Sequence, residues 1–151
     1  RIQQARAAGD WLALERERAP GVDAARDAVV AALEELHERG VEREQLTLAG
    51  FSQGAMLAVD VGLARPELMG AVVAWSGAII DRAAWEQRAP AGVRFTVVHG
   101  ERDTVLPFAQ GQSLFALVQR VDPSAVWVPF DGPHTVSLEG RRALLRALPA
   151  P

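Results

Sequence analysis

Apolar and polar residues alternate along the chain in two patterns, one typical of amphipathic helices and one of buried strands. Between residues 23 and 39, Val29, Ala32, Leu33 and Leu36 share one face of a predicted helix, and Gly40 follows where a left-handed cap would end it. Short apolar runs predict strands at 46–49, 71–75, 94–98 and 125–130. Further helices are predicted at 53–64, 82–87, 108–121 and 138–148. Alternating helices and apolar strands are typical of an α/β fold, a mainly parallel sheet with helices on both faces.

The segment Gly50-Phe51-Ser52-Gln53-Gly54 joins the first predicted strand to the helix after it. In a Gly-x-Ser-x-Gly turn of this kind the serine is strained and exposed, and a Cβ on either flanking glycine would collide with the neighbouring strand or helix. We interpret Ser52 as a nucleophile that attacks an ester or thioester carbonyl and becomes acylated. The backbone N–H of Gln53 would then donate to the oxyanion. The alternative is a serine in an ordinary strand-to-helix turn.

A histidine in the last long loop is the predicted general base. His134 follows the fourth predicted strand, and imidazole titrates near neutral pH. His37 lies within the first predicted helix and is expected to face solvent. His99 ends the strand that leads to Asp103, whereas a base and its acid usually come from separate loops.

Asp103 is the predicted partner of this histidine, since a carboxylate there would accept the Nδ1 proton of His134 and fix its tautomer. Asp131 is the alternative acid, but it lies in the same loop as the histidine and is badly placed to reach the far side of the ring. Asp103 could also simply turn its loop and pair with Arg102. The chain order serine, aspartate, histidine is the one expected of an α/β-hydrolase.

Three motifs together resemble the carboxylesterase/phospholipase branch of the α/β-hydrolases, which includes the acyl-protein thioesterases. They are Gly50-Phe51-Ser52-Gln53-Gly54, His99-Gly100-Glu101-Arg102-Asp103-Thr104-Val105-Leu106-Pro107 and Gly132-Pro133-His134. The resemblance runs from about residue 23 to the last predicted helix, and it departs from the family at Pro133, where members usually carry glycine. It implies that four strand–helix units of the α/β-hydrolase fold are present. The family's opening strands and the loop that supplies a second oxyanion donor would lie upstream of residue 1.

The N-terminal part of the chain does not supply those strands. We expect one domain over residues 1–151, in which residues 1–22 form a poorly defined segment without two buried strands. The strand before Ser52 would then lie at a sheet edge with unpaired backbone groups. Either further residues precede this segment or a second copy covers the edge in a homodimer, and we favour the first.

Composition limits the classes of partner. With 151 residues, of which 49% are hydrophobic, the chain can bury a core. A net charge of −3 argues against nucleic acid and against stable anchoring to an anionic membrane. The absence of cysteine excludes disulfides and a thiolate nucleophile, and no cluster of histidines and carboxylates has metal-ligand spacing, so neither a metal nor another cofactor is expected. Residues 1–6 lack the apolar core of a signal peptide, and we expect a cytoplasmic protein.

The predicted function is a serine carboxylesterase that hydrolyses small acyl esters of short to medium chain length, with thioesters and lysophospholipids as related substrates. Ile79, Ile80 and Leu106, with Val105 and Phe108 around the acid, are expected to line an apolar groove for the acyl group, although apolar loop residues can equally belong to a satellite core. The alternative is a non-catalytic α/β-hydrolase fragment or binding scaffold that keeps the three polar residues. The absent second oxyanion donor supports that alternative.

Overall fold

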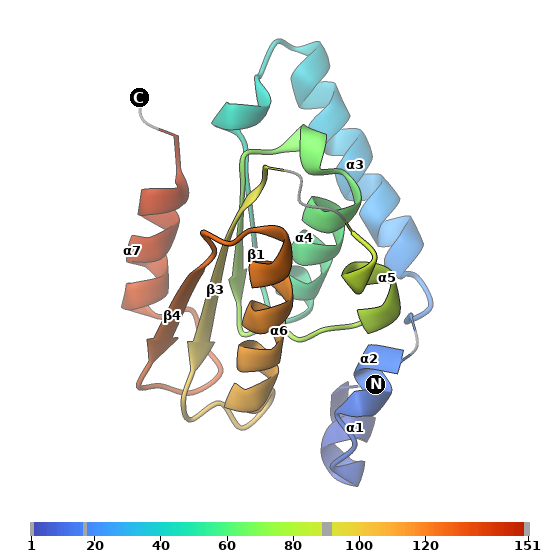
Figure 1. Ribbon diagram of the computed structural model, residues 1–151, viewed down its shortest axis with the longest axis vertical. Helices are drawn as coiled ribbons and strands as arrows, with labels where there is room; N and C mark the ends of the chain where they lie inside the picture. Colours follow the sequence, from blue (N-terminus) through green and yellow to red (C-terminus); the bar gives the residue numbers. More distant parts are fainter. Residues whose placement is uncertain (1, 17, 89–91, 150–151) are drawn as a thin grey trace.

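The computed structural model describes residues 2–16, 18–88 and 92–149 (Figure 1). Within these ranges one sheet has four parallel strands in the order β1-β2-β3-β4. Their bounds are Thr47–Phe51 for β1, Ala71–Trp75 for β2, Arg94–Gly100 for β3 and Val126–Phe130 for β4. All four predicted strands are confirmed, with ends that differ by two residues at most. Because the strands are parallel, the loops that follow them meet at one edge of the sheet.

Helices cover both faces of this sheet (Figure 1). The longer ones are α3 (Val22–Glu38), α4 (Gln53–Ala64), α6 (Phe108–Val121) and α7 (Leu138–Ala147), and the shorter ones are α5 (Arg82–Glu86) and the 3₁₀ turns η1 (Arg43–Gln45) and η2 (Pro66–Leu68). Helices α4 and α6 pack on one face, with α3 outside α4, and their side chains form the larger core. Helix α7 covers the opposite face and forms a smaller core with β2, β3 and β4. The predicted α/β fold with helices on both faces is confirmed.

Burial differs between the inner and outer strands. Every residue of β2 is buried, and so is β3 after its first residue. The outer strands are only partly covered: Phe51 at the end of β1 is 37% exposed and Val126 at the start of β4 is 50% exposed. The sequence therefore predicted burial on both faces correctly for the inner strands only. Within the described residues β1 pairs with β2 alone, so its other edge has no partner strand in this part of the chain.

Helix α3 has a narrower apolar face than the sequence predicts. Val30 and Leu33 are buried, but Ala32 and Leu36 are exposed. The reason is that α3 packs against α4 rather than directly on the sheet, and a contact between two helices buries a narrow stripe. Gly40 adopts a φ of 86°, as the predicted left-handed end of this helix requires.

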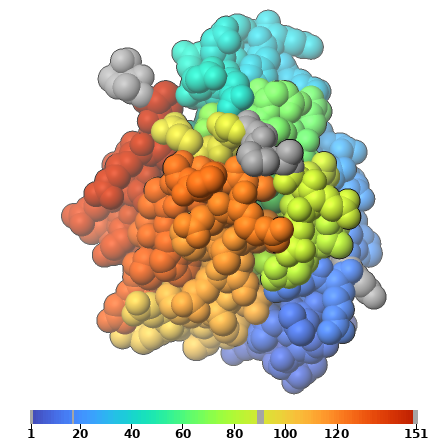
Figure 2. All heavy atoms as spheres, viewed as in Figure 1, coloured from blue at the N-terminus to red at the C-terminus, as the bar shows by residue number. Residues whose placement is uncertain are grey.

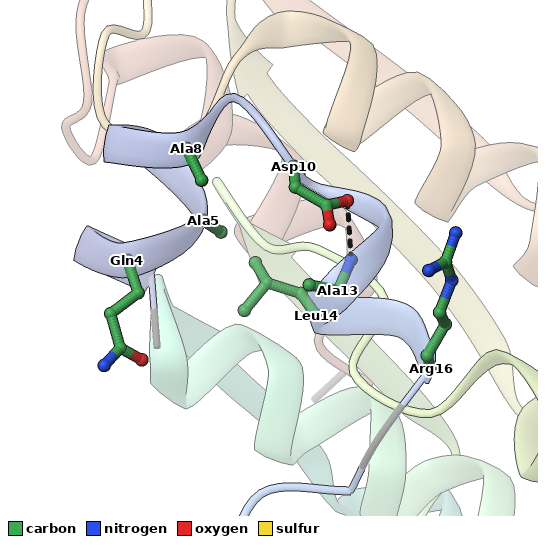
Figure 3. Close-up of a pocket in the computed structure, with 7 residues that line it drawn as sticks. All are labelled: Gln4, Ala5, Ala8, Asp10, Ala13, Leu14 and Arg16. Carbon is green, nitrogen blue, oxygen red and sulfur yellow. Dashed lines mark hydrogen bonds between the residues drawn. The ribbon is translucent and has the colours of Figure 1, made fainter.

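The N-terminal segment forms two short helices, α1 (Ile2–Ala8) and α2 (Leu12–Arg16), so the expectation of a poorly defined segment is wrong for its described residues. Residues 1 and 17 of that segment lie outside the described ranges. An oxygen of Asp10 accepts a hydrogen bond from the Ala13 N–H at 3.2 Å and so caps the start of α2 (Figure 3). Figure 2 shows the N-terminal residues packed below the α5 region, where Arg82 donates to the buried Glu15 at 2.6 Å.

A buried carboxylate on α4 anchors the end of this segment. Asp60 is 2% exposed and accepts two hydrogen bonds from the Arg18 guanidinium, at 3.0 and 2.6 Å, and one from Trp85 Nε1 at 2.8 Å. Burial by itself would raise the pKa of Asp60, but the hydrogen bonds from Arg18 and Trp85 outweigh it and hold the pKa below its usual value. The sequence assigned no role to Trp85, and the structure gives it this one.

Candidate active site

Ser52 lies in a strained turn between β1 and α4. Its φ of 55° and ψ of −117° fall where side chains rarely go. The Ser52 N–H donates to the Trp75 carbonyl at 2.9 Å, which continues the strand pairing, while the Ser52 carbonyl accepts from Ala55 and Met56 of α4. The strand and the helix thus hold the serine between them at the carboxyl edge of the sheet.

The two glycines that flank this serine have different surroundings. A Cβ on Gly50 would lie 2.1 Å from the Gly54 carbonyl oxygen, so the close approach of strand and helix requires glycine there. A Cβ on Gly54 would meet no atom within 4 Å. The predicted collision is confirmed for Gly50 and is wrong for Gly54, whose Cβ would point into open space.

Asp103 lies in the loop that follows β3, and its carboxylate is fixed by backbone donors. One oxygen, Oδ1, accepts from the N–H groups of Val105 and Leu106, each at 2.8 Å. The residue is 6% exposed. Its second oxygen, Oδ2, is therefore left to face the loop that follows β4.

His134 comes from that loop and joins the other two residues. Its Nδ1 lies 2.6 Å from Asp103 Oδ2, and its Nε2 lies 3.0 Å from Ser52 Oγ. A carboxylate only accepts, so the ring proton is on Nδ1, and the Nε2 lone pair is free to accept from the serine hydroxyl. The Phe51 ring packs against the imidazole with centroids 4.7 Å apart. The structure thus brings together the three residues that the sequence singled out.

The alternative base and acid candidates lie elsewhere. His37 is half-buried rather than facing solvent, and its Nε2 donates to the Leu68 carbonyl at 3.0 Å. His99 is fully buried, and its Nε2 donates to the Leu106 carbonyl at 2.9 Å. Asp131 is exposed and forms an ion pair with Arg102 at 2.6 Å, so Arg102 pairs with this carboxylate rather than with Asp103.

An apolar cavity of about 400 Å³ reaches the start of α4 beside Ser52. The residues that line it include Gln53, Gly54, Leu14, Met56, Leu57 and Ile80. Leu14 also lines a second hollow, together with residues of α1 such as Gln4 and Ala8 (Figure 3). The sequence missed Leu14 because the N-terminal segment was not expected to fold.

The residues predicted to line the acyl groove lie in different places. Ile79 and Leu106 have no exposed surface, and both belong to the larger core. Ile80, which was also predicted to line the groove, lines the cavity. The structure gives the prediction for Ile79 and Leu106 no support.

Two further observations bear on the kind of site. Across residues 2–16, 18–88 and 92–149, no three side chains of histidine, aspartate or glutamate lie together as ligands for a metal ion. No helix of the described chain is long and apolar enough to cross a membrane.

The sequence profile of the phospholipase/carboxylesterase family matches residues 10–132, which include Ser52, Asp103 and the loop that leads to His134. The chain belongs to the phospholipase/carboxylesterase family. A comparison with curated proteins gave no match.

Solved structures similar to this phospholipase/carboxylesterase chain have the same α/β-hydrolase fold. SOBER1 from Arabidopsis thaliana is 20% identical with a TM-score of 0.75, and 83% of this chain covers 62% of that one. Esterase PE8 is 28% identical with a TM-score of 0.73, and 85% of this chain covers 62% of that one. A phospholipase/carboxylesterase from Dyadobacter fermentans is 24% identical with a TM-score of 0.73, over 84% of this chain and 63% of that one. The chain thus spans somewhat less than two thirds of the length of these structures.

Proposed function

We propose that the protein is a serine hydrolase of carboxylic esters. The observation that carries the proposal is the unbroken line of hydrogen-bonding contacts from Asp103 through His134 to Ser52, at 2.6 and 3.0 Å. The backbone around these contacts is also unusual. Ser52 has a strained backbone, and residue 50 has no room for a Cβ, whereas an accidental contact of polar side chains would need neither. Membership of a family of phospholipases and carboxylesterases agrees with it.

In the proposed reaction Ser52 Oγ attacks the ester carbonyl while His134 Nε2 takes its proton. The imidazolium then gives this proton to the leaving alkoxide, and an acyl-enzyme remains. Water attacks the acyl-enzyme with His134 again as the base, and the acid is released. Asp103 accepts from Nδ1 throughout, which fixes the tautomer and stabilises the imidazolium.

The oxyanion of each tetrahedral intermediate would accept a hydrogen bond from the Gln53 N–H. Gln53 is the first residue of α4, and the first N–H groups of a helix have no partner within the helix. The start of the helix also carries partial positive charge, which favours an anion there. One such donor is typically worth about 10²- to 10³-fold in kcat.

The test of this proposal is the hydrolysis of p-nitrophenyl acetate by the parent protein and by Ser52→Ala. We expect Ser52→Ala to lower kcat by at least about 10³-fold, because no other group can form the acyl-enzyme. Ser113→Ala on α6 is the matched control and is expected to retain the parent rate. A Ser52→Ala variant as fast as the parent would overturn the proposal.

We further propose that the apolar cavity beside Gln53 holds the acyl chain. Its volume of about 400 Å³ suits a small ligand, and Leu14, Met56 and Ile80 give it an apolar wall. Each methylene buried there would favour binding by about 0.8 kcal/mol, so longer acyl chains would react faster until the cavity is full. The protein would then prefer acyl groups of short to medium length.

Filling the cavity tests this part of the proposal. Leu14→Trp is expected to remove the advantage of p-nitrophenyl octanoate over the acetate in kcat/KM, while acetate hydrolysis persists. Leu12→Trp is the matched control, since Leu12 lies on the same helix, is 56% exposed and does not line the cavity. An unchanged chain-length profile in Leu14→Trp would place the acyl group elsewhere.

A further inference from the structure

A buried histidine that the proposed reaction does not use lies directly behind the acid. His99 is the penultimate residue of β3 and has no exposed surface. Its Nε2 lies 2.9 Å from the Leu106 carbonyl oxygen. A carbonyl oxygen only accepts, so the proton of the neutral ring is on Nε2.

The other ring nitrogen has been left without a partner. Nδ1 of His99 is buried and makes no hydrogen bond to any described residue. It faces Gly111 of α6, where a Cβ would lie only 2.3 Å away. The helix therefore comes close to the ring only because residue 111 is glycine.

Burial keeps this ring uncharged. Desolvation lowers the pKa of His99, against the opposing effects of its bond to Leu106 and of the Asp103 carboxylate. The charged and titratable groups that face it are Asp103, with Oδ2 3.5 Å from Nε2, and His134 beyond that carboxylate. An ion pair with Asp103 is thus not the role of His99.

The acceptor of His99 belongs to the residue that holds the acid. The Leu106 N–H donates to Asp103 Oδ1 at 2.8 Å, while the Leu106 carbonyl accepts from His99. Leu106 is therefore tied at both ends, to the carboxylate through its nitrogen and to β3 through its oxygen. The rigid strand fixes the loop, the loop fixes the carboxylate, and the carboxylate fixes the ring of His134.

We propose that His99 is a positioning residue for the Ser52–His134–Asp103 site, acting through its hydrogen bond to the Leu106 carbonyl. The inference rests on the proposed function for its kinetic effect, but the bond it explains is present whatever the substrate. Without the His99 donor the Leu106 carbonyl loses its tie to β3, and Asp103 no longer holds the His134 ring at the angle that Ser52 needs. Displacements of about 1 Å at such sites typically cost about 10²-fold in rate.

Three variants separate positioning from packing. His99→Met fills a similar space without a donor, and His99→Gln restores an N–H near the place of Nε2. His37→Met is the matched control, because His37 also donates from Nε2 to a backbone carbonyl, that of Leu68 at 3.0 Å. All are compared at a temperature where thermal unfolding shows each to be folded.

We expect His99→Met to lower kcat about 10- to 100-fold with KM within about twofold of the parent. The acid limb of its rate profile should move to lower pH, because a displaced carboxylate stabilises the His134 imidazolium less. His99→Gln should recover most of the rate, and His37→Met should keep both the rate and the profile. A folded His99→Met with the parent kcat and pH profile would overturn the inference, as would equal losses in His99→Gln and His99→Met.

A spectroscopic measurement separates this inference from the proposed function. The His134 Nδ1 proton, in its 2.6 Å bond to Asp103, should give a downfield proton resonance. That resonance should shift upfield or broaden in His99→Met and stay unchanged in His37→Met, even if the protein hydrolyses no ester. If it stays in place in His99→Met, His99 does not position the acid, whereas a parent without esterase activity would count against the proposed function alone.

Discussion

Gly50 and Gly54 flank the same serine, but only one of them is sterically fixed. A Cβ on Gly50 would come within 2.1 Å of a backbone oxygen of α4, whereas a Cβ on Gly54 would meet nothing within 4 Å. A backbone contact cannot be relieved by rotating a side chain, so the strand or the helix would have to move. Gly50 and Gly54 thus look alike in the sequence but differ in the space around them.

This difference predicts opposite effects of one substitution on stability. Gly50→Ala should lower the free energy of unfolding by several kcal/mol, since overpacking in a close contact typically costs about 1–3 kcal/mol even where side chains can adjust. Gly54→Ala should leave it unchanged or raise it by up to about 1 kcal/mol, because alanine favours a helix over glycine. Urea denaturation of the two variants measures both. Equal effects would mean that the turn is not packed as described.

The rate of ester hydrolysis should depend on pH through His134. Only the neutral ring can take the serine proton, so kcat/KM is expected to rise with pH between about pH 5 and 8. A stopped-flow or plate assay with p-nitrophenyl acetate, corrected for spontaneous hydrolysis, measures it. A flat profile over this range would contradict a histidine base.

Addition of EDTA should leave the rate unchanged.

At the scale of elements, the N-terminal segment is held to α4 and α5 by charged side chains as well as by Ala5 and Leu14, which are buried in the larger core. Arg18 and Trp85 both donate to the buried Asp60, and Arg82 donates to the buried Glu15. The hydrogen bonds that Arg18 donates to Asp60 also raise the pKa of Arg18, against the effect of its burial. These pairs set the position of Leu14, the residue that closes the apolar cavity.

Removing Arg18, the partner of Asp60, should therefore destabilise the folded protein. Arg18→Met leaves Asp60 buried with fewer donors, and we expect the free energy of unfolding at pH 7 to fall by about 3 kcal/mol. Arg39→Met is the control, because Arg39 pairs with Glu35 on the exposed face of α3, where such a pair is worth about 0.5 kcal/mol or less. Chemical denaturation of both variants gives the two values. Similar losses in the two variants would show that the Asp60 cluster is not a true anchor.

The sequence predicted the order and type of the elements from residue 22 onward. Each strand is an apolar run, and residues that end helices mark the helix boundaries. Residues such as Gly40 and Pro66 mark ends that the local chain alone determines. The exposed side of α3 and the fold of residues 2–16 could not be predicted in this way. Both depend on which neighbour an element meets: α3 packs on α4, and α2 packs on α5 through the Glu15–Arg82 pair.

At the scale of the whole molecule, stability should depend on pH through the buried His99. Its pKa is lowered in the folded protein relative to the usual 6.5, so the unfolded chain binds more protons as the pH falls below that value. Above pH 6.5 His99 is neutral in both the folded and the unfolded chain, and stability is not reduced. As the pH decreases from 6.5 toward the pKa of His99 in the folded protein, protonation of the unfolded chain progressively lowers the free energy of unfolding. The titratable groups that face His99 are Asp103 and His134.

The comparison of the parent with His99→Gln isolates this contribution. The free energy of unfolding of the parent should fall more steeply between about pH 6.5 and the acid transition, by up to about 1.4 kcal/mol per pH unit, than that of His99→Gln. Urea denaturation at several pH values provides both slopes. Parallel slopes would mean that folding does not lower the pKa of His99.

The sequence also predicted that Ser52, Asp103 and His134 would lie together, because each of them follows a strand of one parallel sheet. It could not predict the cavity, since Leu14 and Ile80 come together only when the N-terminal helices pack beside α4. Nor could it assign His99, which looked like an alternative base. Its role depends on the direction of a single ring nitrogen toward the Leu106 carbonyl.

The central claim is that Ser52 is an activated nucleophile, and reaction with a fluorophosphonate probe tests it most directly. Intact-mass measurement of the folded protein should show one adduct per chain, which is absent from Ser52→Ala and strongly slowed in His134→Gln. Absence of an adduct on the parent, or an adduct that persists in Ser52→Ala, would contradict the account and favour a binding scaffold without catalysis.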